Sequence, residues 1–397
     1  RCGLAEYCNR ECQRGDWKLH KAKCKSLTEI VVDTDVKNRL QSGALKRRLD
    51  TLREGTVILK IRDPDITTIG DMNLTVERAH LEAPFYEYES LLRVDLKGCT
   101  KLTSVGNAAF AYCTSLTSIV LPDSLTQLGD GAFGDCTTLT SVVLPDSLTQ
   151  IGDAAFGDCT SLTSVVLPDS LTQMGYGAFG ECTSLTSVVL PDSLMQIGDA
   201  AFMKCTSLTS LVFPNSLTQL GKWAFQECSS LTSVVFPDSL TQIGQTTFAR
   251  CTSLTSVVLP DSLTQLGVGA FLRCSSLTSV VLPYFLKQIG ESAFADCTSL
   301  TSLVLPDSLT QLGDTAFAKC SSMTSVVLPD SLSQICDGAF LQCTSLTSVV
   351  LPDSLTQLSE GAFQDCTSLT SMVLPDSVTE IGKWAFLRCS SLMSVIL

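Results

Sequence analysis

Four cysteines and one histidine lie within the first 24 residues of the chain, at Cys2, Cys8, Cys12, His20 and Cys24. Cys8 and Cys12 are four residues apart, and so are His20 and Cys24. Residues with this spacing share one face of a helix, so each pair can offer two ligands to one metal ion. Thiolate and imidazole together suit tetrahedral zinc. A segment this short cannot build a hydrophobic core, so the pattern favours a zinc site over a metal-free cysteine cluster.

Around these ligands the sequence reads Tyr7-Cys8, Cys12-Gln13, Trp17, His20-Lys21 and Cys24, with Cys2 six residues before Cys8. These residues and spacings resemble the second half of a MYND-type zinc finger. The resemblance implies two zinc ions with interleaved ligands, in which Cys8 and Cys12 complete the first site. Cys2, His20 and Cys24 would serve the second. The family pattern begins with further cysteines upstream of Cys2, and this sequence lacks them, which leaves two ligands for the first site and three for the second.

The same resemblance implies a partner, because MYND-type fingers usually bind short proline-containing peptides. By this resemblance Gln13 and Trp17 would line the peptide groove. Trp17 packing over the zinc-bound helices is the alternative. Several lysines make the finger basic, which permits DNA binding, although a solvated helix face explains them adequately.

Most of the remaining chain consists of one repeated sequence. Twelve copies of a 23-residue unit run without a gap from Leu116 to Ser391, and each reads approximately Leu-Thr-Ser-Val-Val-Leu-Pro-Asp-Ser-Leu-Thr-Gln-Ile-Gly-x-x-Ala-Phe-x-x-Cys-Thr-Ser. A fixed period of this length indicates a stacked solenoid. Alternation directs Leu116, Ile119 and Leu121 inward, and proline then ends the strand. We expect Ala-Phe-x-x-Cys to form a short helical turn, with its phenylalanines in a buried column from Phe133 to Phe386.

The motifs Leu-Pro, Ile/Leu-Gly and Ala-Phe-x-x-Cys cover about three quarters of the chain and resemble the leucine-rich repeats of the BspA-like class. Ordinary leucine-rich repeats carry an asparagine ladder after the strand, and here Pro-Asp stands in that place. The expected fold is an α/β repeat solenoid with a parallel β-sheet, preceded by a small zinc-bound α-helical finger. BspA-like repeats occur in surface adhesins and in intracellular families of protists.

We expect the chain to have four parts: a partial finger over residues 1–27, a helical linker over 28–53, divergent N-terminal cap repeats over 54–115, and the solenoid over 116–397. The solenoid part holds the twelve units and a terminal strand. Because ligands are missing at one end and a cap at the other, we expect the sequence to be a fragment of a longer protein.

Charge and cysteine content restrict the possible partners. Residues 99–397 hold 9 Lys/Arg and 24 Asp/Glu, a net charge of −15, which argues against broad nucleic-acid contact. No run of 18 apolar residues exists, so no transmembrane helix is expected. Thirteen cysteines recur every 23 residues from Cys113 to Cys389. We expect buried reduced thiols here, with disulfides between stacked units as the alternative.

The outer face of the expected sheet shows a serine column beside a valine column, from Ser118 and Val120 onward. An apolar stripe of that length indicates a groove for an extended partner, and a β-favouring filler is the alternative. Aspartate follows the proline in ten of twelve units. It is expected to form the turn, and a calcium ladder is less well supported because one carboxylate per unit is sparse.

The favoured function is a zinc-binding adaptor whose finger and solenoid each hold a protein, with no catalytic residues and no enzymatic activity. Zinc-binding thiolates suit a reducing compartment, so an intracellular location, cytoplasm or nucleus, is expected. One alternative is a cell-surface adhesin of the BspA-like class. Another is part of a SET/MYND-type methyltransferase, for which residues 28–98 are too short.

Overall fold

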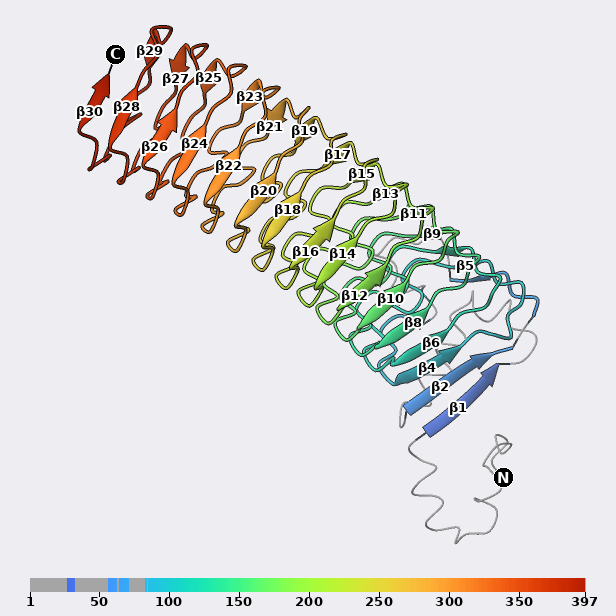
Figure 1. Ribbon diagram of the computed structural model, residues 1–397. Helices are drawn as coiled ribbons and strands as arrows, with labels where there is room; N and C mark the ends of the chain where they lie inside the picture. The colour runs from blue at the N-terminus through green and yellow to red at the C-terminus, as the bar shows by residue number, and fades with distance from the viewer. Residues whose placement is uncertain (1–26, 33–55, 63, 71–82, 84, 397) are drawn as a thin grey trace, which may run out of the picture.

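The computed structural model describes residues 27–32, 56–62, 64–70, 83 and 85–396, and these form one long solenoid of parallel strands (Figure 1). Each unit supplies one longer strand and one short strand, and each kind stacks upon its counterpart in the next unit. Paired strands are in register at intervals of 23 residues, as in Ser141 beside Ser118 and Gln150 beside Gln127. The fixed period of the sequence is therefore the fixed step of the solenoid.

The longer strands form one side, called here the long-strand face. In order they are β1 (Leu27–Val32), β2 (Thr56–Ile61), β4 (Leu91–Asp95), β6 (Ser118–Val120), β8 (Ser141–Val143), β10 (Ser164–Val166), β12 (Ser187–Val189), β14 (Ser210–Val212), β16 (Ser233–Val235), β18 (Ser256–Val258), β20 (Ser279–Val281), β22 (Ser302–Val304), β24 (Ser325–Val327), β26 (Ser348–Val350), β28 (Ser371–Val373) and β30 (Ser394–Ile396). Figure 1 shows them side by side along the whole length.

The short strands form a second side along the edge reached after each Pro-Asp turn (Figure 1). They are β3 (Thr68–Ile69), β5 (Ser104–Val105), β7 (Gln127–Leu128), β9 (Gln150–Ile151), β11 (Gln173–Met174), β13 (Gln196–Ile197), β15 (Gln219–Leu220), β17 (Gln242–Ile243), β19 (Gln265–Leu266), β21 (Gln288–Ile289), β23 (Gln311–Leu312), β25 (Gln334–Ile335), β27 (Gln357–Leu358) and β29 (Glu380–Ile381).

The third side consists of turns, which corrects the predicted α/β architecture: none of the described residues is helical. Gly131 and Asp135 adopt φ of 59° and 57°, in the left-handed region, on either side of Ala132 and Phe133. A right-handed helix cannot continue through such residues. Instead, alternate N–H groups bond to the next unit, as in Phe133 N–H donating to the Ala155 carbonyl at 2.8 Å. The turn thereby stacks as a third ladder.

A second correction concerns the predicted helical linker over residues 28–53. Within it, Leu27–Val32 is a strand that pairs in parallel with β2 over six residues. This stretch reads Leu-Thr-Glu-Ile-Val-Val, and such β-branched residues favour strands. The remaining linker residues, 33–53, lie outside the described residues.

The core is a column of stacked phenylalanines surrounded by leucines and cysteines. Leu116, Ile119 and Leu121 are buried as predicted. The rings from Phe133 to Phe386 stack with centroids 5.2–5.9 Å apart. Phe110, 23 residues before Phe133, and Phe85, which the 23-residue spacing did not reveal, extend this column toward the N-terminal end, with their ring centroids 4.9 Å apart.

Candidate protein-binding surface

The predicted zinc ligands Cys2, Cys8, Cys12, His20 and Cys24 and the predicted peptide-binding residues Gln13 and Trp17 all lie outside the described residues. In the part of the chain that the structure describes, no group of three or more His, Cys, Asp or Glu side chains could hold a metal ion. The surface with functional potential among the described residues is the long-strand face.

Valine forms a continuous exposed row along this face, from Val120 through Val373 and ending at Ile396. The exposed fraction of these valines runs from 39% at Val120 to 84% at Val304. Strand alternation explains the row, because the apolar residue before it in each strand, such as the buried Val142, faces the core. Strand spacing is about 4.8 Å, so the twelve valines span roughly 50 Å.

Most hydroxyl groups of the repeat are occupied by bonds between units. Thr140 Oγ1 donates to the Thr117 carbonyl at 3.3 Å, and Ser147 Oγ donates to the Leu125 carbonyl at 2.6 Å. Equivalent bonds recur in other units, for example from Thr163 and Ser170. These side chains hold successive units together. The valine row and the neighbouring serine column, which includes Ser118 and Ser141, are the parts of this face left for a partner.

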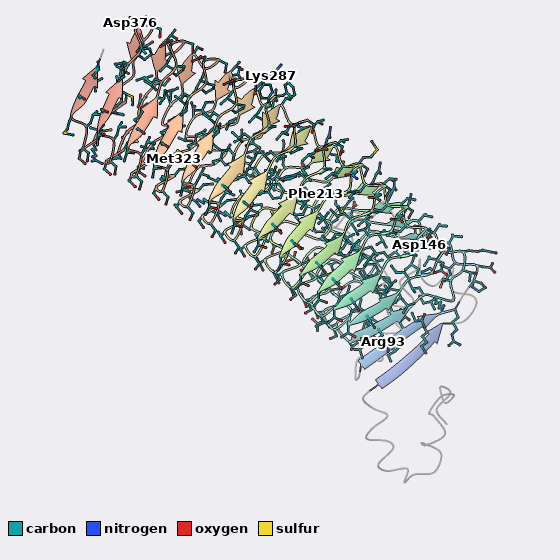
Figure 2. The ribbon with its side chains drawn as sticks, in the orientation of Figure 1. Arg93, Asp146, Phe213, Lys287, Met323 and Asp376 are labelled. Carbon is teal, nitrogen blue, oxygen red and sulfur yellow. The ribbon has the colours of Figure 1, made fainter. Side chains whose placement is uncertain are left out.

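Aspartate forms a second row, called here the aspartate rim, at the turn that follows each longer strand. Its ten members are exposed: Asp123, Asp146, Asp169, Asp192, Asp238, Asp261, Asp307, Asp330, Asp353 and Asp376. Figure 2 shows Asp146 and Asp376 along one long edge of the solenoid. Within the described residues, no hydrogen bond or ion pair engages any of these ten carboxylates.

A different aspartate column provides the ladder that the sequence seemed to lack. Asp130 Oδ1 accepts the Asp153 N–H at 2.9 Å, and Asp153 Oδ1 accepts the Tyr176 N–H at 2.7 Å. Asn107 Oδ1 does the same for the Asp130 N–H at 2.8 Å. With the equivalent bonds of Asp199, Asp314 and Asp337, six units carry a side-chain ladder after the glycine, in place of the asparagine ladder of ordinary leucine-rich repeats.

A third charged column occupies the left-handed position before each cysteine, and its members pair with one another. Lys204 Nζ lies 2.5 Å from Glu181 Oε1, and Arg250 Nη1 lies 3.0 Å from Glu227 Oε1. Partial burial, and then the neighbouring acids, raise the pKa of Asp158. These exposed pairs each contribute little free energy, but they neutralise most charges of this column, all except those of Asp135 and Asp158 among its described acids.

Two units depart from the aspartate rim, one through Asn215 and the other through an aromatic pair. Tyr284 and Phe285 replace Asp-Ser there, are 64% and 58% exposed, and meet edge to face with ring centroids 5.2 Å apart. Lys287 follows them and lies along the same edge (Figure 2). Ser308 Oγ donates to the Tyr284 carbonyl at 2.6 Å, so the next unit holds this backbone in place.

The repeat cysteines are free thiols, as predicted, and all but Cys389 are buried. Each donates to a phenylalanine carbonyl of the preceding unit, as Cys228 Sγ does to the Phe202 carbonyl at 3.3 Å. Burial raises the pKa of Cys228 to about 12. Protonated and shielded thiols of this kind are chemically inert, so the column is structural.

No helix among the described residues is long and apolar enough to cross a membrane.

Comparison with known proteins identifies the family of the repeats. The family model of the BspA type leucine rich repeat region matches residues 82–208, 195–324 and 310–397. The chain belongs to the BspA-type leucine-rich repeat family. A MYND finger model matches residues 1–24, as the resemblance suggested.

Several solved structures are similar to this chain, and the first of them supports this assignment. A leucine-rich repeat protein from Bacteroides ovatus is 32% identical, with a TM-score of 0.75, and the match covers 83% of this chain and 82% of that one. A leucine rich cell surface protein from Faecalibacterium prausnitzii is 26% identical, with a TM-score of 0.45 and coverage of 77% and 83%. The pneumococcal vaccine antigen PcpA is 19% identical, with a TM-score of 0.47 and coverage of 84% and 92%. Among curated proteins, no match to this chain was found.

The expected intracellular location is contradicted by these comparisons. The BspA-type repeats to which this chain belongs are found in surface adhesins, which argues against that location. That expectation rested on the zinc-binding thiolates predicted for residues 1–24, which lie outside the described residues. The solenoid thiols place no such requirement on the compartment, because they are buried and protonated.

Proposed function

We propose that this chain is a protein-binding solenoid of the adhesin kind, acting at the cell surface, which holds an extended partner protein against its long-strand face. The observation that carries the proposal is the uninterrupted row of exposed valines. An apolar stripe of that length exceeds what a soluble monomer usually leaves open. Leucine-rich repeat solenoids generally bind proteins, and the proposal is accordingly of a binding protein rather than an enzyme.

Site-specific photo-crosslinking tests this proposal within a single unit. A benzophenone amino acid replaces Val258 on the long-strand face or, as the control, Val268 on the turn side of the same unit; both are exposed. The full chain is then incubated with an extracellular protein extract and irradiated. Protein adducts are expected from position 258 and few from position 268. Equal yields from both positions would refute the proposed face.

A second proposal concerns residues 1–24, where the MYND finger model matches. We infer that they form a separate zinc-binding domain over residues 1–27, linked through 28–53 and the cap repeats 54–115 to the solenoid. Cys8 and Cys12 would hold one zinc, and Cys2, His20 and Cys24 another. The four thiolates and one imidazole fit zinc chemistry.

Peptide binding by this finger is proposed to depend on Gln13 and Trp17. Trp17→Ala should abolish binding of a fluorescent proline-containing peptide, because the groove would lose its aromatic side chain. The zinc content, measured by mass spectrometry, should stay unchanged. Loss of zinc together with peptide binding would instead show that Trp17 packs over the metal-bound core.

A further inference from the structure

The three acidic columns of the solenoid differ in how their charges are balanced. Carboxylates of the first, such as Asp153, accept backbone N–H groups of the next unit. Those of the second, such as Glu227, pair with Arg or Lys in adjacent units. The aspartate rim has neither kind of partner within the described residues. Its carboxylates recur at the strand spacing of about 4.8 Å, so their mutual repulsion is not offset inside the chain.

The described part of the solenoid places almost no positive charge near this rim. Residues 99–397 contain nine Lys and Arg. Five of them occupy the left-handed column before the cysteines, and two, Lys222 and Lys383, follow the glycine of their unit. Lys101 pairs with Asp65 at 2.7 Å. Among these nine, only Lys287 lies on the rim edge, so the rim carboxylates are left to solvent cations or to the basic groups of a partner.

The rim and the valine row lie next to each other along the whole solenoid. Each rim aspartate follows an exposed valine by three residues, as Asp261 follows Val258, and the Leu259 and Pro260 between them are buried. A partner covering the valine row therefore also meets the carboxylates. A second copy of this chain is disfavoured as that partner, because it would bring the same acidic rim and a net charge of −15 for residues 99–397.

Tyr284 and Phe285 interrupt the rim with an aromatic pair between Asp261 and Asp307. Exposed aromatic rings beside carboxylates attract Lys and Arg side chains through cation–π contact. Aromatic residues also dominate the energy of protein interfaces. This unit is thus the one place where a bound cationic chain could distinguish one repeat from the next.

We propose that the long-strand face binds an extended basic polypeptide. Its Lys and Arg side chains pair with the aspartate rim, its apolar side chains cover the valine row, and Tyr284 with Phe285 sets its register. This inference rests on the proposed function and adds the chemistry of the partner to it.

The test uses the full chain and a fluorescein-labelled twelve-residue peptide of alternating Lys and Val, followed by fluorescence anisotropy at low and at physiological salt. Binding is expected for this peptide, with affinity falling as salt rises, and none for the matched Glu-Val peptide. Absence of Lys-Val binding to the wild-type chain would overturn the proposal.

Two quadruple variants remove the same charge from different columns. The rim variant carries Asp→Asn at Asp238, Asp261, Asp307 and Asp330. The control variant carries Asp→Asn at Asp153, Asp199, Asp314 and Asp337. Asparagine occurs naturally in both columns, at Asn215 and Asn107, so both variants should fold, which their melting curves verify.

The rim variant should bind the Lys-Val peptide about tenfold more weakly or worse, because each exposed ion pair contributes modestly and four are removed. The control variant should stay within about twofold of wild type. Equal weakening in both variants would mean that bulk charge, and not the rim, attracts the peptide. Unchanged affinity in the rim variant would also overturn the proposal.

Two further measurements test the aromatic pair and the charge of the partner separately. Tyr284→Asn with Phe285→Ser gives this unit the natural Asn215-Ser216 pair, removes both rings without adding a charge, and should weaken binding severalfold; no change would remove the register role. Crosslinking from position 258 is repeated in the rim variant. Adducts that persist undiminished there would leave the proposed function standing and refute the basic partner.

Discussion

At the scale of single residues, the repeat forces certain positions into the left-handed region whatever side chain they carry. Thr246 has φ of 48°, although a β-branched residue is a genuine outlier there. Its Oγ1 is buried without a hydrogen-bond partner. Glycine occupies the equivalent position in five units, for example Gly269. Thr246 is therefore a point where the sequence has departed from what the backbone favours.

We predict that Thr246→Gly stabilises the solenoid by roughly 0.5–1 kcal/mol, because relief of the left-handed strain outweighs the added freedom of the unfolded chain. Chemical denaturation measures the change. Thr315→Gly is the matched control: Thr315 has φ of 51°, but its hydroxyl bonds to Ser292 Oγ at 2.7 Å. A smaller gain is expected there, and equal gains would rule out the contribution of the unpaired hydroxyl.

At the scale of the unit, serine has two different roles within 23 residues. Ser262 Oγ donates to the Leu240 carbonyl of the preceding unit at 2.6 Å. Ser256, in β18, is exposed and has no such bond. One serine therefore joins units, while the other contributes to the surface.

Ser262→Ala should accordingly cost about 1 kcal/mol, the usual contribution of one hydrogen bond. Ser256→Ala should change the stability by less than about 0.5 kcal/mol. Urea denaturation of the two variants compares them directly. If both losses were the same, the hydroxyl ladder would not be a source of cohesion between units.

The phenylalanine column is the other element that joins units. Phe248 is fully buried and stacks between Phe225 and Phe271, with centroids 5.5 Å from each. Phe248→Ala should cost roughly 3–5 kcal/mol, the range for a large buried aromatic. Phe285→Ala, at an exposed ring, serves as the control in thermal melting. An unchanged midpoint for Phe248→Ala would contradict the column as the core.

These elements also show which features the sequence reveals. Strand alternation is local, so the buried Ile119 and the exposed Val120 follow from period two alone. The spacing of Ala132, Phe133 and Cys136 looks helical, but Gly131 and Asp135 in the left-handed region prevent a helix, and the varied residues at these positions conceal that requirement. The Asp130 ladder, the hydroxyl ladders and the unpaired aspartate rim depend on contacts between units, which one unit's sequence does not contain.

At the scale of the whole molecule, the buried thiols make the folded chain less stable as the pH rises into the alkaline range. Burial raises the pKa of Cys182, Cys228, Cys274 and Cys320 to about 12, above the ordinary value near 9. Between these values the folded chain binds more protons than the unfolded chain, so the free energy of unfolding falls as pH rises. Below about pH 8 both states hold the protons, and the effect vanishes.

We predict that the melting temperature falls steeply between about pH 9 and 11. Each such thiol lowers the free energy of unfolding by up to about 1.4 kcal/mol per pH unit in this range. Calorimetry across this range should detect protons released on unfolding. Cys228→Ala with Cys274→Ala should lower stability at pH 8 but make the alkaline slope shallower. A slope that these substitutions leave unchanged would show that other groups cause the loss.

The left-handed charged column has one more consequence, for folding. Units this similar can stack on a neighbour one repeat away with nearly the same contacts, so the chain has competing arrangements in which a unit is looped out. Glu181 beside Lys204 and Glu227 beside Arg250 differ from unit to unit, whereas the phenylalanines and hydroxyl ladders do not. The pairs add little to stability, yet they penalise misaligned stacks that would bring like charges together. Their effect should therefore be on the yield of correctly folded chains more than on the melting temperature.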